Sequence, residues 1–327
     1  MSREAVVEAI LNADRITAIC HENPDADTLG SALALRIAAG RLGKQAEVVA
    51  ADPVPPSLVD LTGASEVRTT PQLEPDLAVV LDGPLSRTGA VVTDAAAWLA
   101  RARIVNVDHH VSNDGEGASV SWVDAEAAAT CEMMAMLIGD LGVEMDAEIA
   151  TVLTAGIVQD THTFSHPNAT PRTLRVAADL LAAGAPLSAI HRSIYADKPF
   201  STLALWGRIM AGIAQRRDGR IVYASLTTAM LAETRTDPVA SEGFIDLMAS
   251  TKAADITVLL KEVDATHTRV SVRTSARADA VVITSVFGGG GHARAAGCSI
   301  DASLVDATTK LLDECERELD RADARGR

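Results

Sequence analysis

The chain has 327 residues, 48% of them hydrophobic and 22% charged, which is typical of a folded protein with about two domains. Its net charge is −15, and only 3% of its residues are aromatic. Long nucleic acids are bound mainly by Lys and Arg side chains that neutralise phosphates, and single strands also need aromatic stacking. The composition therefore argues against a partner as large as long DNA or RNA, whereas a short nucleotide at a local positive site remains compatible with it.

The cysteines and the apolar segments restrict the cellular setting. The four cysteines lie far apart without a CxxC pair, which argues against a zinc ribbon and a disulfide framework. Residues 1–15 lack the features of a signal peptide, and no apolar run reaches the ~18–20 residues that a membrane span needs. We expect a cytoplasmic protein without membrane contact.

The first part of the chain alternates short apolar runs with helical patterns. Strands buried on both faces are predicted at Arg15–Cys20, Glu47–Ala50, Leu77–Leu81 and Ile104–Val107. Helices are predicted at Leu29–Leu42, Ala125–Leu141, Ala147–Val158 and from Thr170-Pro171 to about Gly184. Residues 1–190 are therefore predicted to form an α/β domain with a mostly parallel, doubly wound sheet.

The second part of the chain has a different pattern. Residues 191–214 predict a helical connector that breaks at Pro199. Strands follow at Ile221–Leu226, Ile256–Glu262 and Arg269–Arg273, then Ala280–Phe287, a glycine run and a charged amphipathic helix at Leu304–Arg325. Residues 215–327 are therefore predicted to form a smaller mixed α/β domain.

Acidic and imidazole side chains follow three of the predicted strands, and a further carboxylate ends the apolar run of residues 151–159. Because ligands bind outside the carboxyl ends of the strands in open α/β sheets, we expect these side chains to meet at one edge. They are His21, Asp25, Asp27, Asp82, Asp108, His109, His110 and Asp160. Clustered carboxylates repel one another unless cations compensate them, so we expect two divalent metal ions. Oxygen ligands with a minority of imidazoles favour Mn²⁺, with Mg²⁺ or Co²⁺ as alternatives.

Together these motifs resemble those of the DHH phosphoesterase superfamily. The similarity lies in H-x-N-P-D-A-D-x-x-G-S from His21 to Ser31, in Asp82, in Asp108-His109-His110 and in Asp160. The segment from Gly288 to His292, followed by Ala295-Ala296-Gly297, resembles the signature of the DHH-associated (DHHA1) substrate-binding domain. The resemblance covers nearly the whole chain. It is strongest to the bacterial bifunctional oligoribonuclease and 3′-phosphoadenosine-5′-phosphate (pAp) phosphatase type, whose actinobacterial members are cyclic di-AMP phosphodiesterases.

The resemblance implies a role for each matching residue. His21, Asp25 and Asp82 would hold one ion, while Asp27, Asp82, His109 and Asp160 would hold the second, so that Asp82 bridges the pair. His110 would contact the phosphate, and Asp108 would orient its neighbours. In the second domain, substrate binding would fall to Arg273, Ser275, Gly289, Gly290, Gly291, His292 and Arg294.

The implied reaction is hydrolysis by in-line attack of a metal-bridging hydroxide. Its substrates would be small nucleotides, namely cyclic di-AMP, RNA dinucleotides and pAp, and the enzyme would be a homodimer. Two other functions stay open: a pyrophosphatase or exopolyphosphatase on the same metal core, and a non-catalytic nucleotide sensor. The glycine run also has a structural interpretation, a tight turn between helix and strand, beside close approach of the backbone to a phosphate. His162 and His166 are interpreted as surface or orienting residues, with lining of the site as the alternative.

Overall fold

The computed structural model describes residues 3–89 and 101–325, and it divides into two compact units at Asp197 and Lys198. The predicted connector, 191–214, spans this division. Of the helices in the described ranges, none is alone both long and apolar enough to cross a membrane. One pair, Pro171–Ala182 with Leu187–Ala196, meets that requirement only when joined, and it is bent by 113°.

The first unit is built on a five-stranded parallel sheet with the order β2-β1-β3-β4-β5. Its strands are β1 (Arg15–Ile19), β2 (Gln45–Val49), β3 (Leu77–Leu81), β4 (Arg103–Asp108) and β5 (Val120–Val123). The chain reverses its direction of progress between β1 and β3, and such a switch point leaves a crevice at the carboxyl ends of the two strands. The residues that follow β1 and β3 therefore lie where a ligand is expected.

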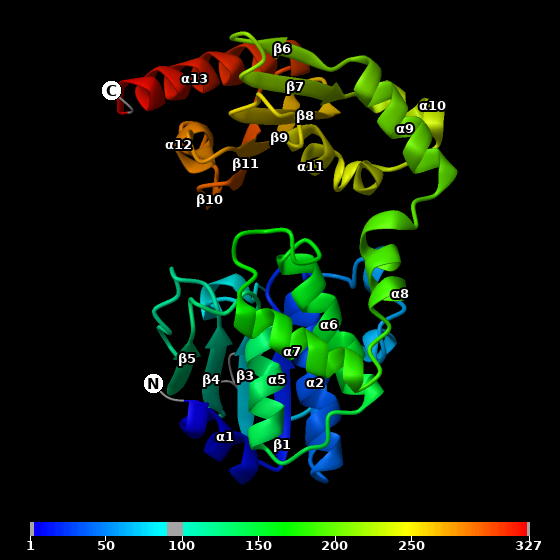
Figure 1. Ribbon diagram of the computed structural model, residues 1–327, viewed down its shortest axis with the longest axis vertical. Helices are drawn as coiled ribbons and strands as arrows, with labels where there is room; N and C mark the ends of the chain where they lie inside the picture. Colours follow the sequence, from blue (N-terminus) through cyan, green and yellow to red (C-terminus); the bar gives the residue numbers. More distant parts are fainter. Residues whose placement is uncertain (1–2, 90–100, 326–327) are drawn as a thin grey trace. The chain divides into compact units, whose positions relative to one another are not determined.

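Helices cover this sheet: α2 and α5 contact its strands, and α6 packs on these two helices (Figure 1). The helices are α1 (Arg3–Asn12), α2 (Ala26–Arg41), α5 (Thr130–Asp140), α6 (Ala147–Asp160), α7 (Pro171–Ala182) and α8 (Leu187–His191). Short turns are η1 (Pro56–Leu58), η2 (Ala64–Glu66), η3 (Leu85–Arg87) and the π-helical turn η4 (Arg192–Ala196). The predicted cap of α7 is present, because Thr170 accepts a hydrogen bond from the Thr173 amide and Pro171 opens the helix.

The second unit contains a six-stranded mixed sheet with the order β10-β11-β9-β8-β7-β6, in which only β7 and β8 run parallel. The strands are β6 (Ala214–Arg216), β7 (Ile221–Leu226), β8 (Ile256–Asp264), β9 (His267–Thr274), β10 (Gly290–His292) and β11 (Ala295–Ile300). The other elements are α9 (Phe200–Ala211), α10 (Thr228–Thr234), η5 (Pro238–Ser241), α11 (Phe244–Ala249), α12 (Ala280–Ser285) and α13 (Leu304–Arg325). A parallel sheet followed by a smaller mixed α/β unit confirms the predicted fold class.

Close packing of α2 against α6 depends on glycine. A Cβ on Gly30 would lie 2.3 Å from the carbonyl oxygen of Val152 in α6, and one on Gly156 would lie 2.7 Å from the Asp27 carboxylate. No side chain fits at such distances, because real carbon–oxygen contacts are about 1 Å longer. The glycine of the first motif therefore sets the spacing between the helices that carry Asp27 and Asp160.

We expect Gly30→Ala to lower the free energy of unfolding by about 1–3 kcal/mol, since the added methyl group overpacks a backbone contact. Denaturant unfolding followed by circular dichroism measures this change. Gly40→Ala is the matched control in the same helix, because nothing lies within 4 Å of its Cβ position. Alanine there should raise stability by about 0.5–1 kcal/mol. Equal effects at both positions would contradict the packing argument.

Candidate metal centre

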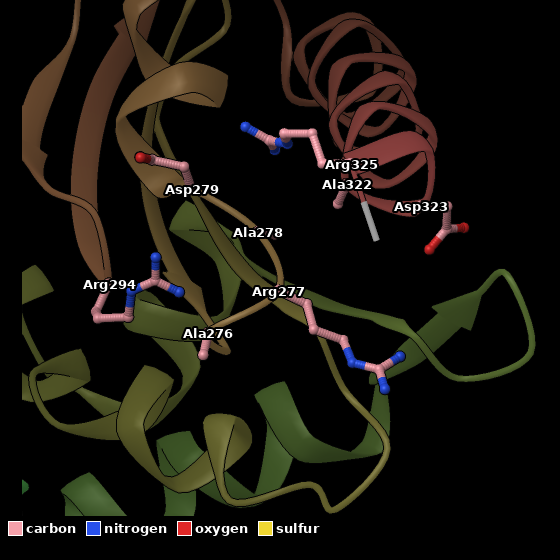
Figure 2. Close-up of a pocket in the computed structure, with 8 residues that line it drawn as sticks. All are labelled: Ala276, Arg277, Ala278, Asp279, Arg294, Ala322, Asp323 and Arg325. Atoms are coloured by element: carbon pink, nitrogen blue, oxygen red, sulfur yellow. The ribbon is translucent and has the colours of Figure 1, made fainter. Parts of the chain in front are cut away.

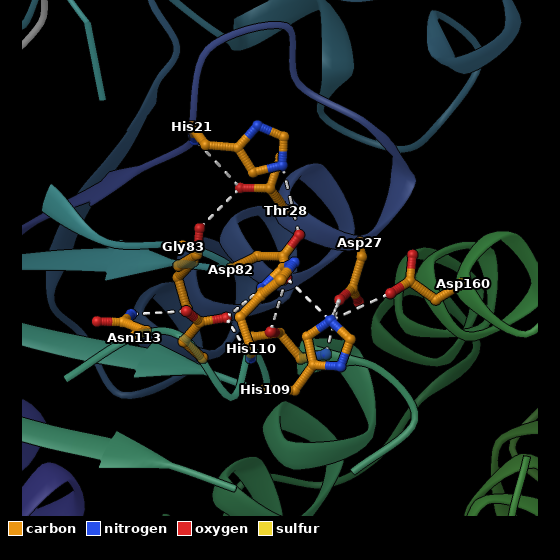
Figure 3. A network of polar contacts seen from close by, with 12 residues as sticks. His21, Asp27, Thr28, Asp82, Gly83, His109, His110, Asn113 and Asp160 are labelled. Carbon is orange, nitrogen blue, oxygen red and sulfur yellow. Dashed lines mark hydrogen bonds and ion pairs between the residues drawn. The ribbon is translucent and has the colours of Figure 1, made fainter. Parts of the chain in front are cut away.

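Among the residues that the structure describes, the predicted acidic and imidazole side chains cluster at the carboxyl ends of β1, β3 and β4 (Figure 3). His21 comes two residues after β1, and Asp82 directly follows β3 with a φ of 64°, a left-handed conformation that aspartate tolerates better than most residues. His109 directly follows β4, whereas Asp160 is the last residue of helix α6. The parallel register of the sheet therefore brings together side chains that are far apart in the sequence.

One group of ligand atoms consists of His21, Asp25 and Asp82. Nε2 of His21 lies 3.4 Å from Oδ2 of Asp82 and 3.7 Å from Oδ1 of Asp25. The other ring nitrogen, Nδ1, lies 2.8 Å from the carbonyl oxygen of Glu22 and donates to it. That bond fixes the tautomer, so the lone pair of Nε2 faces the two carboxylates, which is the arrangement of a metal ligand.

A second group consists of Asp27, His109 and Asp160. Nε2 of His109 lies 3.2 Å from Asp160, 3.5 Å from Asp82 and 3.9 Å from Asp27. Its Nδ1 is 3.2 Å from the carbonyl oxygen of Ala127. Although three carboxylates surround it, the buried Nε2 makes no hydrogen bond of acceptable geometry within the described part of the chain. A buried polar atom without a partner among acceptor oxygens fits a position for a cation.

The pKa values of the cluster reflect burial and the close spacing of its carboxylates. Burial and the neighbouring charges of Asp27, Asp25 and Asp160 raise the pKa of Asp82 well above its usual value. Burial and Asp27 likewise raise the pKa of Asp160 to about 7. Burial lowers the pKa of His109, but the neighbouring carboxylates of Asp160, Asp27 and Asp82 outweigh that effect and raise it to about 10. The donor set of carboxylates and imidazoles suits divalent cations, which would compensate the repulsion among these carboxylates.

The first residues of α5 donate hydrogen bonds to two carboxylates of the cluster. The amides of Thr130 and Cys131 donate to the two oxygens of the Asp27 carboxylate, at 2.6 and 2.8 Å. The Thr130 hydroxyl donates to Oδ1 of Asp82 at 3.0 Å. A helix N-terminus stabilises negative charge, so these bonds hold Asp27 and Asp82 in fixed orientations. The sequence analysis did not identify Thr130, and the predicted helix at Ala125–Leu141 begins in the structure only at this residue.

Asp108 and His110 form a pair at the edge of the cluster, where His110 also makes a third group of possible ligand atoms with Asp82 and His109. Nδ1 of His110 lies 2.7 Å from Oδ1 of Asp108, and the Asn113 amide donates to Oδ2 of the same carboxylate at 2.6 Å. Burial opposes ionisation of Asp108, but these bonds lower its pKa below the usual value. The carboxylate therefore stays charged and orients the His110 ring. Asn113 is a further residue that sequence analysis missed, although it lies only three positions after His110.

In the second unit, Arg273 and Ser275 both have protein partners. Nε of Arg273 donates to Asp246 in α11 at 2.8 Å, and the guanidinium is about one-third exposed. The Ser275 hydroxyl donates to Asp255 at 2.9 Å. Arg273 lies on β9 opposite Ala295 of β11. Its ion pair is solvent-accessible, so an anionic ligand can compete with Asp246 for the guanidinium.

The glycine run forms a hairpin with β11. A Cβ on Gly289 would lie 2.3 Å from the carbonyl oxygen of Gly297, and one on Gly291, where φ is 140°, would lie 2.6 Å from that of Ala295. The need for glycine at these two positions is therefore explained by strand packing alone. Gly290 has nothing within 4 Å of its Cβ position, which leaves its backbone accessible to a ligand.

Arg294 follows this hairpin strand and lines a pocket of about 550 Å³ with Arg277, Asp279, Asp323 and Arg325 (Figure 2). Its guanidinium donates to the carbonyl oxygen of Ser275. The backbone of His292 belongs to β10, but its side chain lies outside the described part of the structure. His162 and His166 are exposed, and their rings stack with centroids 5.2 Å apart.

Comparisons with known proteins agree with this architecture. Residues 15–157 match the N-terminal domain of the DHH family, and residues 218–318 match the DHHA1 domain. A Thermus thermophilus protein named bifunctional oligoribonuclease and PAP phosphatase NrnA is 32% identical over 305 residues, 92% of this chain and 89% of that protein. A Bacillus subtilis protein of the same name is 26% identical over 95% of this chain and 96% of its own length.

A solved structure shows the same fold over almost the full length. An exopolyphosphatase-related protein from Bacteroides fragilis superposes with a TM-score of 0.90 and 22% identity, covering 98% of this chain and 97% of that one. At this identity the likeness concerns the fold alone. The extent of the match to the Thermus thermophilus relative, together with both domain matches, shows that the chain belongs to the DHH family, with a DHH domain followed by a DHHA1 domain.

Proposed function

We propose that this protein is a metal-dependent phosphoesterase that hydrolyses short nucleotides. The candidate reactions are conversion of cyclic di-AMP to pApA and AMP, cleavage of RNA dinucleotides, and removal of the 3′-phosphate of pAp. The observation that carries the proposal is the position of Asp82 at the switch point of the sheet. Asp82 belongs to the ligand group of His21 and lies 3.5 Å from His109 of the second group. The names of the relatives support the choice of short nucleotides as the substrate class.

We assign His21, Asp25 and Asp82 to a first divalent cation, and Asp27, Asp82, His109 and Asp160 to a second. For these ions we propose Mn²⁺, which would supply Lewis acidity toward the phosphoryl oxygens and activate water for hydrolysis. The bonds from Thr130 and Cys131 would keep the Asp27 carboxylate oriented toward its ion. The protein thus offers a preformed set of ligands, which limits the reorganisation needed when substrate binds.

His110 would contact the phosphoryl group undergoing hydrolysis. Asp108 holds the ring through Nδ1, and Asn113 holds Asp108, so we assign Nε2 of His110 to a phosphoryl oxygen. A hydrogen bond to charge that develops in the transition state accelerates the reaction more than one that is equally strong in the ground state. In this proposal Asp108 is a positioning residue for His110.

The second unit would bind the remainder of the nucleotide. Arg273, once released from Asp246, provides a guanidinium for a terminal phosphate, and Ser275, Arg294 and His292 are assigned to the same task. Gly290 offers an accessible backbone, whereas Gly289 and Gly291 support this surface by allowing the hairpin to form. We therefore propose catalysis for residues 1–190 and substrate binding for residues 215–327. A homodimer and a cytoplasmic location remain part of this proposal.

The proposal is tested by incubating metal-stripped protein, with and without Mn²⁺, with cyclic di-AMP, pApA, pAp and pyrophosphate. We expect release of AMP from the adenine nucleotides only when Mn²⁺ is present, with pyrophosphate unchanged, because the ligand set needs cations to act on a phosphoryl group. Chromatography of the products at several times gives the order of preference among substrates. Cleavage of pyrophosphate alone would favour a pyrophosphatase, and nucleotide binding without turnover would favour a sensor.

A further inference from the structure

The loop after Asp160 has an unusual backbone. His162, Thr163 and Phe164 are three consecutive residues with left-handed φ values of 46°, 55° and 64°. This conformation is unfavourable for residues that carry a Cβ, and it persists only where the surroundings impose it. Such segments concentrate at functional sites, so the contacts that hold this loop indicate what it is coupled to.

The loop is held by residues 187–196, which form α8 and η4 and precede the second unit in the sequence. We call residues 187–196 the connecting segment. The Thr163 hydroxyl lies 2.8 Å from Nδ1 of His191, and the rings of His162 and Tyr195 have centroids 4.6 Å apart. His191 ends α8, and Tyr195 belongs to η4, the π-helical turn that ends at Ala196, next to the division between the units. Single π-helical turns are rare and are found mostly at functional sites.

Tyr195 also contacts the helix that carries Asp160. Its hydroxyl donates to the carbonyl oxygens of Gln159 and Val158, at 3.0 and 3.3 Å. These carbonyls belong to the last turn of α6, and they also accept hydrogen bonds from the amides of His162 and Thr163, at 3.1 and 2.8 Å. The phenol of the connecting segment thus caps the helix end whose final residue is Asp160.

Gln159 extends this connection to the first motif. Its Oε1 accepts a hydrogen bond from the Ala26 amide at 2.8 Å. Ala26 lies between Asp25 and Asp27, which belong to the two different ligand groups. Three residues, Tyr195, Gln159 and Ala26, therefore link the connecting segment to carboxylates of both groups. We call these three residues the clasp.

We propose that Tyr195 and Gln159 are positioning residues that couple metal affinity to the conformation of the connecting segment. The Tyr195 hydroxyl fixes the end of α6, and so the place of Asp160 beside Asp27 and His109. Gln159 fixes the loop that holds Asp25 and Asp27. This inference rests on the proposed metal-dependent function, because it concerns the affinity of the same carboxylates for their ions.

The test is Tyr195→Phe, which removes the hydroxyl and keeps the ring packed against His162. We expect the affinity of metal-stripped protein for Mn²⁺, measured by isothermal titration calorimetry, to fall about 10-fold, as is typical when a group that orients metal ligands is lost. Gln159→Leu should act in the same direction. At limiting Mn²⁺ the hydrolysis of pAp should slow, and excess Mn²⁺ should restore it.

The chain offers a matched control, because its second tyrosine, Tyr223, lies in β7 of the other unit. Tyr223→Phe should bind Mn²⁺ as the wild type does. An unchanged Mn²⁺ affinity in Tyr195→Phe, with or without loss of thermal stability in the metal-free protein, would overturn the inference and leave the proposed function intact. If the wild type itself does not bind Mn²⁺, the metal site and the clasp are both refuted.

Discussion

Replacement of Asp82 by alanine is expected to abolish hydrolysis of every substrate. Asp82 belongs to one ligand group with His21 and lies 3.5 Å from His109 of the other, so its loss removes a carboxylate from both proposed ion positions. Metal ions contribute several kcal/mol of transition-state stabilisation, and each 1.36 kcal/mol is a factor of ten in rate. We therefore expect kcat/KM to fall by at least about 10³-fold. Product chromatography at saturating Mn²⁺ measures the residual rate.

The isosteric variant Asp82→Asn separates lost chemistry from lost structure. Asparagine tolerates the left-handed backbone at this position and can still accept the bond from Thr130. The folded state raises the pKa of Asp82, so its carboxyl destabilises the metal-free protein increasingly as the pH rises above the unfolded value. Metal-free Asp82→Asn should therefore unfold at a temperature no lower than that of metal-free wild type at pH 7. Substantial activity in either variant would refute the shared role of Asp82.

Asp82→Asn is expected to change the melting temperature in opposite directions, relative to wild type, without and with Mn²⁺. Mn²⁺ stabilises the wild type by mass action, since it binds the folded state and not the unfolded chain. Because Asp82 is a proposed ligand of both ions, most of that stabilisation should disappear when it is replaced. A rise of the metal-free melting temperature together with loss of the Mn²⁺-induced shift would be difficult to explain by a general folding defect.

Much of the candidate metal centre could be located from the sequence, because three of its segments follow buried apolar strands. The run Leu77–Leu81 is a strand with the predicted bounds, and the parallel register then places Asp82 beside the residues that follow β1 and β4. A buried strand is recognised from its own apolar residues, and ligands of open α/β sheets bind at the carboxyl ends of the strands. Both rules can therefore be applied to a single sequence. The strand β5 was not predicted, because Ser121 interrupts the apolar residues of Val120–Val123.

The groups that orient the ligands could not be predicted in the same way. Thr130 donates to Asp27 across 103 positions, and Gln159 accepts from Ala26 across 133, so no local pattern reports these bonds. The alanine-rich segment before Thr130 favours a helix by composition. In the structure the helix begins later, where its first amides meet the Asp27 carboxylate, so a tertiary contact overrides local propensity. The sequence left two interpretations of the glycine run open; the neighbours of Gly289 and Gly291 in β11 support the structural one, and a ligand contact there stays a prediction.

Loss of Arg273 should weaken nucleotide binding without affecting the metal ions. A hydrogen bond to a charged group contributes about 1.5–3 kcal/mol, so Arg273→Ala is expected to raise KM for pAp and pApA about 10- to 100-fold. The proposed metal ligands all belong to the first unit, while Arg273 lies on β9 of the second, so Mn²⁺ content should equal that of wild type. Steady-state kinetics and metal analysis of the same preparation measure both quantities.

Arg208→Ala provides the matched control, because Arg208 also pairs with an exposed carboxylate, Glu233, in the same unit. Its KM should stay near the wild-type value, since an exposed ion pair contributes little to stability and no nucleotide contact is proposed there.

Asp246→Asn tests the competition directly: release of Arg273 from its acidic partner should lower KM, as the guanidinium is then available to phosphate. A change of Mn²⁺ content in Arg273→Ala, or an equal rise of KM in Arg208→Ala, would show that Arg273 has been assigned the wrong role.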